Sequence, residues 1–329
     1  MEVESVTSNK LAAIVQPTQV ARVSGDRRVE EFCADCRLRG MTEESVRRYG
    51  SSVLTFVGFL NGKGVNAESI NAMTLREFLC YLRERRKVSQ KTVENCFSAL
   101  SSFYDYLQFE GIISSNVVVP FRRRYLRTYK EDYSDPERRL LTIEEMGRLA
   151  NSILDPRDKA IALLLAKTGI RRGELLRTDL EDVNWRDYSI TLKPAAKRSN
   201  RVVFFDDECA MVLKRWLAVR EKLKPRVKAL FVSYQSLNRL DRNGCYEAVV
   251  KYARRLGFHD PKSRRLEDHF GPHCFRHFFT TFLLRNGMPR EYVKELRGDS
   301  RREAIDIYNH IDREELRKAY LACVPKLRV

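Results

Sequence analysis

Long apolar runs are absent from this chain of 329 residues. The longest, "AIALLLA" at residues 160–166, is far shorter than the roughly 20 residues that a membrane-spanning helix needs. The first residues, "MEVESVTSNKLAA", lack the positively charged start and the apolar stretch of a secretory signal. We therefore expect a cytoplasmic protein without a membrane partner.

Clustered metal ligands and nucleotide-binding loops are also missing. Eight cysteines are scattered along the chain, and only Cys33 and Cys36 form a C-x-x-C, without the second pair that a zinc site needs. We expect free thiols, as in a reducing compartment, and helix packing for this pair. The sequence has no G-x-x-x-x-G-K-[ST] loop for ATP. We expect neither a metal nor a cofactor.

Acidic residues are in deficit. Lys and Arg total 61 against 44 Asp and Glu, which gives a formal charge of +17 and a pI near 9.6. A surplus of this size favours a polyanionic partner, and nucleic acid is the commonest one. The alternative, an anionic membrane surface, has no supporting segment. We therefore predict binding to DNA or RNA.

The first half of the chain has the pattern of helices. Apolar residues recur at helical spacing from Val46 to Leu60, after Thr42 as a cap. Thr74 and Glu77 have the spacing of a capping box, which predicts the start of a second helix. A third helix is expected from about Ser89. We predict a helical nucleic-acid-binding domain with basic edges over residues 26–118, preceded by an arm at residues 1–25.

Residues 119–138, "VPFRRRYLRTYKEDYSDPER", are charged, contain two prolines and show no apolar period. We predict an interdomain linker there, which at about 3.3 Å per residue is long enough to pass around a bulky partner. A solvated basic surface is the alternative to DNA contact for the charged residues of both halves. The residues for which we predict DNA contact are Arg86, Lys87, Lys91, Arg122, Arg123, Arg124 and Arg198.

The remaining residues, 139–329, combine helices with a pair of short strands. Thr142 and Glu145 form a second capping-box pattern. "YSITLK" and "RVVFF" alternate like the strands of a β-hairpin and flank a basic tip, "PAAKRSN". Helices follow, the last from Asp312 to Pro325. The predicted fold class is mainly α (α+β), with an all-helical first domain and a mixed α/β second domain that holds a small hairpin sheet.

Four stretches of this second domain supply cations or proton donors. They are "TGIRRGELL" (168–176), the hairpin tip, "GPHCFRHFFTTFLL" (271–284) and "LRGDSRREAIDIYNHI" (296–311). Each has an ordinary interpretation by itself: an arginine at a helix start, a solvated turn, or a half-buried tyrosine. His273 and His277 have the i, i+4 spacing of a metalloprotease helix, but Cys274 stands where the H-E-x-x-H motif needs Glu. A metal site is therefore not predicted.

Together the four stretches resemble the tyrosine recombinase family, which includes phage integrases and Xer-type enzymes. T-G-x-R-x-G-E-L, a lysine in the hairpin, H-x-x-R and a tyrosine 32 residues later follow in the family's order. The resemblance covers roughly residues 136–325. The ending of the chain, "AIDIYNHIDREELRKAYLACVPKL" (304–327), looks most like archaeal integrases. The family resemblance implies a site-specific DNA recombinase that acts without ATP or metal. It also implies a tetramer on double-stranded DNA, associated with the nucleoid, whose carboxyl-terminal helix docks on a neighbour.

The resemblance also implies a role for each site residue. The catalytic residues it implies are Arg171, Lys197, His273, Arg276 and Tyr308. The two arginines would clamp the scissile phosphate, and Tyr308 would attack it to form a 3′-phosphotyrosyl bond. Lys197 would protonate the departing 5′ oxygen, with Lys193 as a weaker candidate, and His273 would assist proton transfer. Glu174 matches an acidic position whose role is more structural than chemical.

Asp299 departs from the family pattern, which has His or Trp in "L-G-H-S" where this chain reads "RGDS". A carboxylate beside a phosphate is repulsive, so Asp299 cannot simply replace a donating histidine. Three interpretations stay open: a cap for a helix at Ser300, a partner for an arginine such as Arg302 or Arg276, or a protonated carboxyl group. The predicted function is recombination leading to integration. The alternatives are a Xer-like resolvase of chromosome or plasmid dimers and a catalytically impaired DNA-binding relative.

Overall fold

The computed structural model describes residues 27–126, 139–194, 201–263, 265–299 and 311–329. The chain divides into two compact units, unit 1 (Met1–Tyr133) and unit 2 (Ser134–Val329). Within the described ranges, no helix combines the length and the apolar character needed to cross a membrane.

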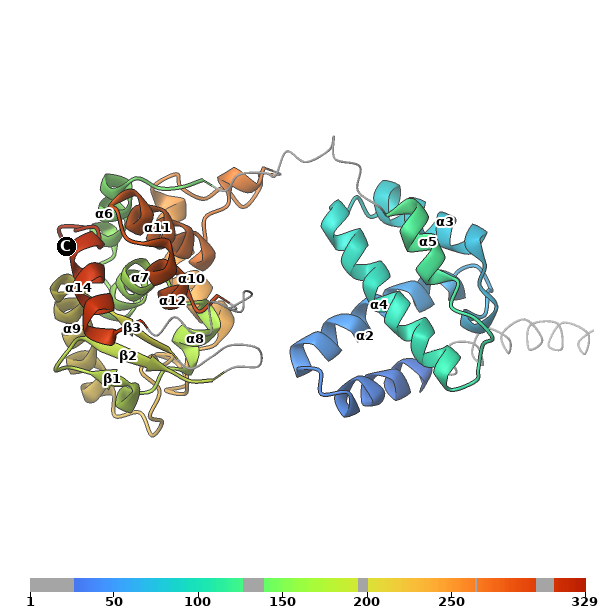
Figure 1. Cartoon of the computed structure of the whole chain (residues 1–329), viewed down its shortest axis with the longest axis horizontal. Helices are drawn as coiled ribbons and strands as arrows, with labels where there is room; N and C mark the ends of the chain where they lie inside the picture. Colours follow the sequence, from blue (N-terminus) through green and yellow to red (C-terminus); the bar gives the residue numbers. More distant parts are fainter. Residues whose placement is uncertain (1–26, 127–138, 195–200, 264, 300–310) are drawn as a thin grey trace, which may run out of the picture. The chain divides into compact units, whose positions relative to one another are not determined.

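Unit 1 is helical throughout its described part (Figure 1). Its helices are residues 27–38, α2 (Glu43–Asn61), η1 (Ala67–Ser69), α3 (Ala72–Cys80), the π turn η2 (Tyr81–Arg85), α4 (Gln90–Phe109) and α5 (Val118–Tyr125). Aromatic rings make up much of its core, where Phe56, Phe78 and Tyr104 are buried. The rings of Phe56 and Phe78 meet edge to face, with their centroids 4.7 Å apart.

The side chains that cap the helices of unit 1 follow the sequence pattern at two of three positions. Thr42 accepts from the backbone of Ser45, and Ser89 opens α4, as predicted. The predicted start at Thr74 is wrong, because α3 begins one turn earlier. The side-chain oxygen of Asn71 accepts from the N–H groups of residues 73 and 74 at 2.9 and 3.0 Å and so caps the helix first.

The predicted linker is wrong in its first residues, which form helix α5. Residues 119–138 were expected to connect the domains, but Val118–Tyr125 is helical and belongs to unit 1. Val118 and Phe121 are buried at i, i+3 spacing, and the ring of Phe121 stacks on Phe97 with centroids 5.5 Å apart. The apolar pair is hard to recognise in the sequence because three arginines directly follow Phe121. Residues 127–138 of the predicted linker lie outside the described part of the chain.

Unit 2 is also mainly helical and contains a three-stranded antiparallel sheet, so the predicted fold class is confirmed. Its helices are α6 (Ile143–Ser152), α7 (Pro156–Thr168), α8 (Arg172–Arg177), η4 (Leu180–Asp182), α9 (Asp207–Leu223), α10 (Arg242–Arg255), η5 (Leu266–Asp268), α11 (Pro272–Arg285), α12 (Arg290–Arg297) and α14 (Arg313–Cys323). The strands are β1 (Val183–Asn184), β2 (Ser189–Leu192) and β3 (Arg201–Phe204), in the order β1-β2-β3. β2 and β3 form the predicted hairpin, with Ile190 opposite Val203.

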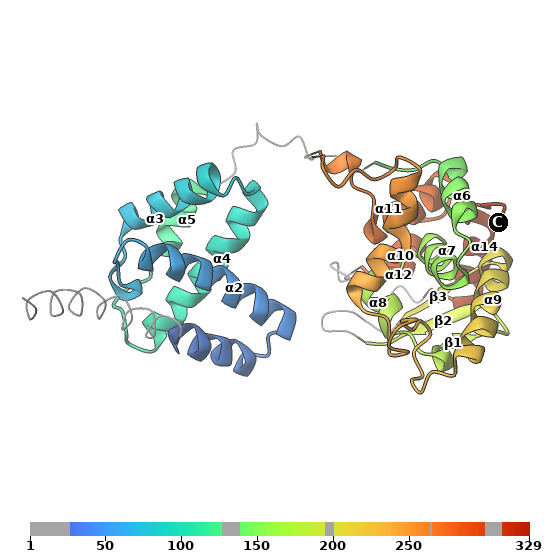
Figure 2. The ribbon, with the colours of Figure 1, turned by 180° about the vertical axis from the view of Figure 1, so that it is seen from behind.

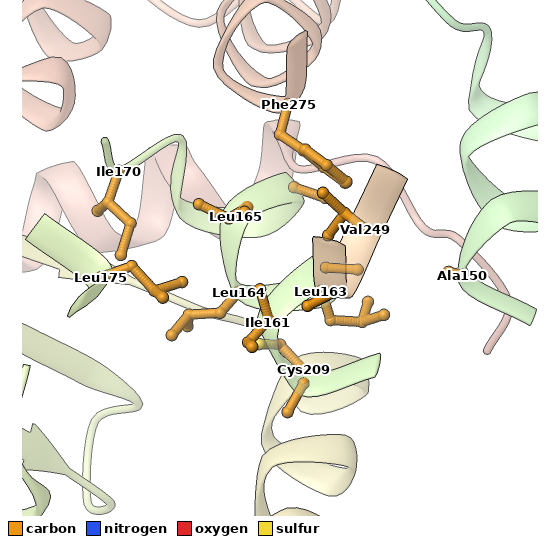
Figure 3. Packing of buried hydrophobic residues seen from close by; sticks show 14 of the residues in the cluster. Ala150, Ile161, Leu163, Leu164, Leu165, Ile170, Leu175, Cys209, Val249 and Phe275 are labelled. Atoms are coloured by element: carbon orange, nitrogen blue, oxygen red, sulfur yellow. The ribbon is translucent and has the colours of Figure 1, made fainter. Parts of the chain in front are cut away.

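Helix α7 runs through the middle of unit 2, with α6, α9, α10 and α11 around it (Figures 1 and 2). Its residues 160–166 are all apolar and buried, as expected for a helix at the centre of a core. In Figure 3 its side chains, among them Ile161 and Leu164, are surrounded by residues of four other helices, namely Leu175, Cys209, Val249 and Phe275. This packing fixes the C-terminal end of α7, from which the first site motif continues.

The C-terminal helix α14 packs on its own unit. Tyr320 is fully buried among residues of α11 and α12, and its hydroxyl donates to the carbonyl of Lys167 at 2.9 Å. The buried ammonium of Lys167 donates to Asp206 and to the carbonyl of Pro325, each at 2.7 Å. These bonds hold both α14 and the residues after it against α7 within the single chain.

Candidate active site

The first site motif depends on a close approach between α7 and α11. Gly169 ends α7 with φ of 59°, and a Cβ there would lie 2.2 Å from the ring of Phe279. A glycine is therefore needed at this position, both for the left-handed turn and for the contact. The turn places Arg171 at the N-cap of α8, close to the helix that carries His273 and Arg276.

Arg171 and Arg276 converge on one backbone carbonyl, that of Arg297 at the end of α12. Arg171 Nη1 donates to it at 3.2 Å and Arg276 Nη2 at 2.8 Å. Arg276 Nη1 also donates to the carbonyl of Gly169 at 2.9 Å. The C-terminal end of a helix carries partial negative charge, so α12 stabilises two guanidinium groups side by side. The structure thus brings together the two arginines that the sequence predicts as a phosphate clamp.

Arg276 is the more deeply buried of the two. Its side chain is 5% exposed, against 27% for Arg171. Burial, together with the charges of Arg171 and Arg297, lowers the pKa of Arg276 to about 9, and the carboxylate of Asp299 opposes this shift. Arg276 therefore remains a cation at neutral pH, where its charge acts at short range in a poorly solvated setting.

Glu174 supports this arrangement from α8. It forms a buried, two-point ion pair with Arg201 of β3, with N–O distances of 3.0 and 2.9 Å, and accepts from the backbone N–H of Arg171 at 2.7 Å. Burial raises the pKa of Glu174, but the bonds and charge of Arg201 and the Arg171 N–H outweigh it and lower the pKa to about 2. These contacts fit the structural role that the resemblance implies for Glu174.

The sequence marks Arg201 as one of the cations of the hairpin but does not predict its structural role. Its Nε donates to the carbonyl of Leu296 at 2.9 Å, so Arg201 links β3 to α12 as well as to α8. The available signal was its place in "RVVFF", where Arg201 shares the inward alternation with Val203. A charged residue at an inward strand position needs a buried partner, which indicates a supporting network.

His273 and His277 lie on the exposed side of the first turns of α11. Their rings meet edge to face, with centroids 4.8 Å apart. His273 precedes the buried Arg276 by one helical turn, so the H-x-x-R spacing places both side chains near the same end of the helix. His273 is therefore close to the arginine pair and reachable from solvent.

Lys193 is engaged at the base of the hairpin. Its ammonium group bonds to the carboxylate of Asp179 and lies 3.4 Å from Asp182. The bond from Asp179 raises the pKa of Lys193, so the lysine holds its proton more firmly in this position. This engagement disfavours Lys193 as the general acid. Lys197 and Arg198 lie outside the residues that the structure describes.

Tyr308 also lies outside the described residues, but both flanks of its segment are described. On one side, Asp299 contacts the arginine pair. On the other, Ile311 packs with the buried residues of α11, α12 and α14. The chain therefore enters the segment that contains Tyr308 directly from the arginine pair.

Asp299 lies among three arginines. One carboxylate oxygen is 3.3 Å from Arg276 Nη2 and 3.8 Å from Arg171 Nη2, and the other is 3.1 Å from Arg297 Nε. Of the three interpretations of Asp299, pairing with an arginine such as Arg276 matches these contacts. Ser300 and Arg302, which the other contacts would involve, are not among the described residues.

In unit 1, α4 and α5 bring three of the predicted DNA-contact residues together. Lys91, Arg122 and Arg123 line a hollow of about 750 Å³. Arg122 is held in place by a bond to Ser98 at 2.9 Å. The other three predicted residues of this unit, Arg86, Lys87 and Arg124, are exposed at the ends of η2 and α5.

Two family profiles cover most of the chain. The phage integrase family matches residues 138–315, and the N-terminal SAM-like domain of phage integrases matches residues 29–110. Among curated proteins, the tyrosine recombinase XerC of Thermodesulfovibrio yellowstonii is 28% identical over 293 residues, which are 86% of this chain and 90% of the relative. XerC of Vibrio vulnificus is 29% identical over 297 residues, 88% of each chain.

Solved structures share the fold at lower identity. The XerH site-specific recombinase bound to its difH substrate has a TM-score of 0.61 and 21% identity, over 89% of this chain and 83% of that one. A lambda integrase dimer bound to a COC′ core site has a TM-score of 0.63 and 14% identity, over 87% and 97%. The two XerC relatives are bacterial, so the archaeal likeness of the ending stays a prediction. The phage integrase profile matches more than half of the residues, so this chain belongs to the phage integrase family of tyrosine recombinases.

Proposed function

We propose that this protein is a site-specific DNA recombinase that cleaves and rejoins DNA strands through Tyr308. The phenol oxygen attacks the scissile phosphorus, the 5′ oxygen of the next nucleotide leaves, and a 3′-phosphotyrosyl bond holds the strand. The observation that carries this proposal is the convergence of Arg171 and Arg276 on the carbonyl of Arg297. It supplies a preformed pair of cations that contacts Asp299, the last described residue before the segment that contains Tyr308.

The arginine pair suits phosphoryl transfer because the charge of the transition state lies on the non-bridging oxygens. Guanidinium groups fixed by other bonds need no rearrangement when this charge develops. Arg276 is fixed through Gly169 and Arg297, and Arg171 through Glu174 and Arg297. The loss of one donor of this kind generally costs about 10²–10³ in rate.

The proton transfers fall to the remaining site residues. A free phenol has a pKa of about 10, so Tyr308 needs nearby cations or a base to attack at neutral pH. His273 lies one turn from Arg276 and is suited to assist there. Lys197 protonates the departing 5′ oxygen, a role that the engaged Lys193 is less suited to fill. The phosphotyrosyl bond keeps the free energy of the phosphodiester, so rejoining requires no ATP.

The partner is duplex DNA. The basic hollow of unit 1 supports this assignment, as do the DNA complexes of the XerH and lambda integrase structures. Exchange of strands requires two duplexes that are cut in turn, which implies a tetramer on DNA. The action on DNA places the protein with the nucleoid in the cytoplasm.

Integration is the outcome that we propose, because Asp299 and the ending resemble integrases. Resolution of chromosome or plasmid dimers is the second candidate. The similarity to XerC proteins along nearly the whole of both chains favours it. The position of the target site separates the two: a site in a tRNA gene beside this gene favours integration.

The test is the covalent capture of the target. Wild type and Tyr308→Phe are incubated in EDTA with nicked fragments of the source organism's DNA, the mixtures are denatured, and protein-bound fragments are sequenced. We expect wild type to retain fragments through a 3′ phosphate at one short sequence, and Tyr308→Phe to bind DNA without forming an adduct. Adduct formation by Tyr308→Phe would overturn the mechanism. So would its absence from wild type when DNA binding is intact, the result expected of a catalytically impaired relative.

A further inference from the structure

The carboxylate of Asp299 occupies the side of the arginine pair on which an anion can bind. Arg276 Nη1 is bonded to the carbonyl of Gly169, and both Arg276 Nη2 and Arg171 Nη1 are bonded to that of Arg297. The Nη2 atoms of both arginines lie within 3.3 and 3.8 Å of the same oxygen, Asp299 Oδ1. A single anionic oxygen thus accepts from Arg276 and lies at ion-pair distance from Arg171, near both guanidinium groups that would hold a phosphate oxygen of a bound substrate.

Arg297 offers this carboxylate a second position. Its Nε is 3.1 Å from the other oxygen, Asp299 Oδ2, and its side chain is 34% exposed. Among the described residues this buried Nε has no hydrogen-bond partner, so Arg297 pairs with Asp299 through charge at ion-pair distance, whereas Arg276 Nη2 donates to Asp299 Oδ1. In the family pattern "L-G-H-S", the residues that flank the glycine are Leu and His, so Arg297 and Asp299 both depart from it.

The glycine between them makes the pairing possible. Gly298 caps α12 with φ of 61°, a left-handed conformation that allows the chain to turn back on the helix end. A Cβ at this position would lie 2.5 Å from Arg201 Nη1, so the turn is packed against the buried Glu174–Arg201 pair. The pairing of Arg297 with Asp299 thus rests on a packed turn, while their side chains are 34% and 31% exposed.

We propose that Asp299 is an internal anion that occupies the phosphate clamp of the DNA-free protein, and that Arg297 retains its carboxylate when a phosphate replaces it on Arg171 and Arg276. The inference rests on the proposed function, because it identifies the clamp's ligand as a DNA phosphate. The carboxylate neutralises part of the repulsion among three clustered arginines. A phosphate must displace it, so an isolated phosphate binds weakly, and the wider DNA contacts must supply the difference.

The competition can be measured with inorganic phosphate on the full-length chain, without DNA. Binding is followed by calorimetry and by thermal unfolding, against chloride at equal ionic strength. Because charged hydrogen bonds no longer have to be exchanged, we expect Asp299→Asn to bind phosphate about tenfold more tightly than wild type. Asp187→Asn is the matched control. It removes the same charge from a different ion pair, that of Asp187 with Arg313, and is expected to leave phosphate affinity unchanged. Arg171→Ala identifies the fraction of phosphate bound at the clamp.

Arg297→Gln distinguishes this inference from a purely structural role. If Arg297 receives the displaced carboxylate, Arg297→Gln weakens phosphate binding in the presence of Asp299, and weakens it much less in the Asp299→Asn background. Equal affinity of wild type and Asp299→Asn, or equal effects of Arg297→Gln in both backgrounds, would overturn the inference. Because phosphate binding requires neither Tyr308 nor DNA cleavage, this result is independent of the adduct assay. If wild type forms the DNA adduct but Asp299→Asn binds phosphate no more tightly than wild type, this inference is wrong and the proposed function stands.

Discussion

Glu174 and Arg201 show how single residues hold the clamp in place. Both side chains are about 97% buried, and each bonds the other at two points. A buried ion pair of this kind adds little net stability compared with apolar residues, but the removal of one partner leaves an uncompensated charge. The same pair supports Arg171 on one side and α12 on the other. Replacement of either partner is therefore expected to lower the stability of the fold and to disturb the site.

Replacement of Glu174 by Gln tests this role. We expect the free energy of unfolding to fall by about 3–5 kcal/mol at pH 7, because Arg201 stays buried without its counter-charge. The folded-state pKa of Glu174, about 2, is lower than its ordinary value of 4.5. Its stabilisation is therefore complete above pH 4.5 and is lost as the pH falls toward 2. Urea unfolding at several pH values measures both effects.

The wild type should lose stability over this acid window more steeply than Glu174→Gln, which has no carboxyl group to titrate there. The comparison isolates Glu174 from the other acidic residues, since these are present in both proteins. Parallel curves for the two proteins between pH 4.5 and 2 would show that the ion pair does not control the acid transition.

At the scale of elements, α5 contributes both to the stability of unit 1, through a buried ring, and to the predicted DNA binding, through its arginines. Phe121 is 4% exposed and stacks on Phe97 of α4, while the next three residues are arginines. The burial of one ring therefore fixes the direction in which Arg122 and Arg123 point toward the hollow. A basic helix that is anchored in this way can present its charges at fixed positions.

Truncation of this anchor should affect both properties. We expect Phe121→Ala to destabilise unit 1 by about 3–5 kcal/mol, as is typical for a buried aromatic ring, and to weaken DNA binding. Phe109→Ala is the control, because Phe109 belongs to the same unit and is 86% exposed. Thermal unfolding and DNA titration measure the two effects. A loss of stability in Phe121→Ala no larger than in Phe109→Ala would show that α5 is not anchored as described.

Local patterns predicted the elements well where one signal dominated. Thr42, Ser89 and the Thr142–Glu145 capping box mark helix starts, because capping is an interaction within one turn. The start of α3 was misplaced because two residues three positions apart, Asn71 and Thr74, can both cap, and the sequence does not rank them.

The candidate site was only partly predictable for a related reason. Arg171 and Arg276 lie in motifs that resemble those of the family, so the resemblance identifies them. The inward strand position of Arg201 indicates a buried partner but not which one, because Glu174 is distant in the chain, and the contact of Arg297 depends on the turn at Gly298. The pairing of Asp299 was one of three open interpretations, and the choice among them depends on how α12 ends.

At the scale of the whole molecule, the charge of +17 is carried by both units. In unit 2 part of it is internal, because Arg220 is buried and donates to the backbone carbonyls of Ala229 and Val227. The surplus available to DNA is therefore smaller than the formal charge. This distinction matters for binding, since only cations that replace counterions on DNA contribute to its salt dependence.

The hollow of unit 1 allows that contribution to be counted. Lys91 is 78% exposed and only loosely paired with Glu94, at 3.3 Å, so it is available to a phosphate. We expect Lys91→Ala and Arg123→Ala each to reduce the slope of log K against log salt by about 0.9 on non-specific duplex DNA, the value for one lost phosphate contact. Lys63→Gln is the control: Lys63 bonds Glu77 at 2.6 Å in the same unit and should leave the slope unchanged. Fluorescence anisotropy across a salt series gives the slopes. If all three variants shift the affinity equally and keep the wild-type slope, the hollow does not contact DNA, and the loss reflects net charge alone.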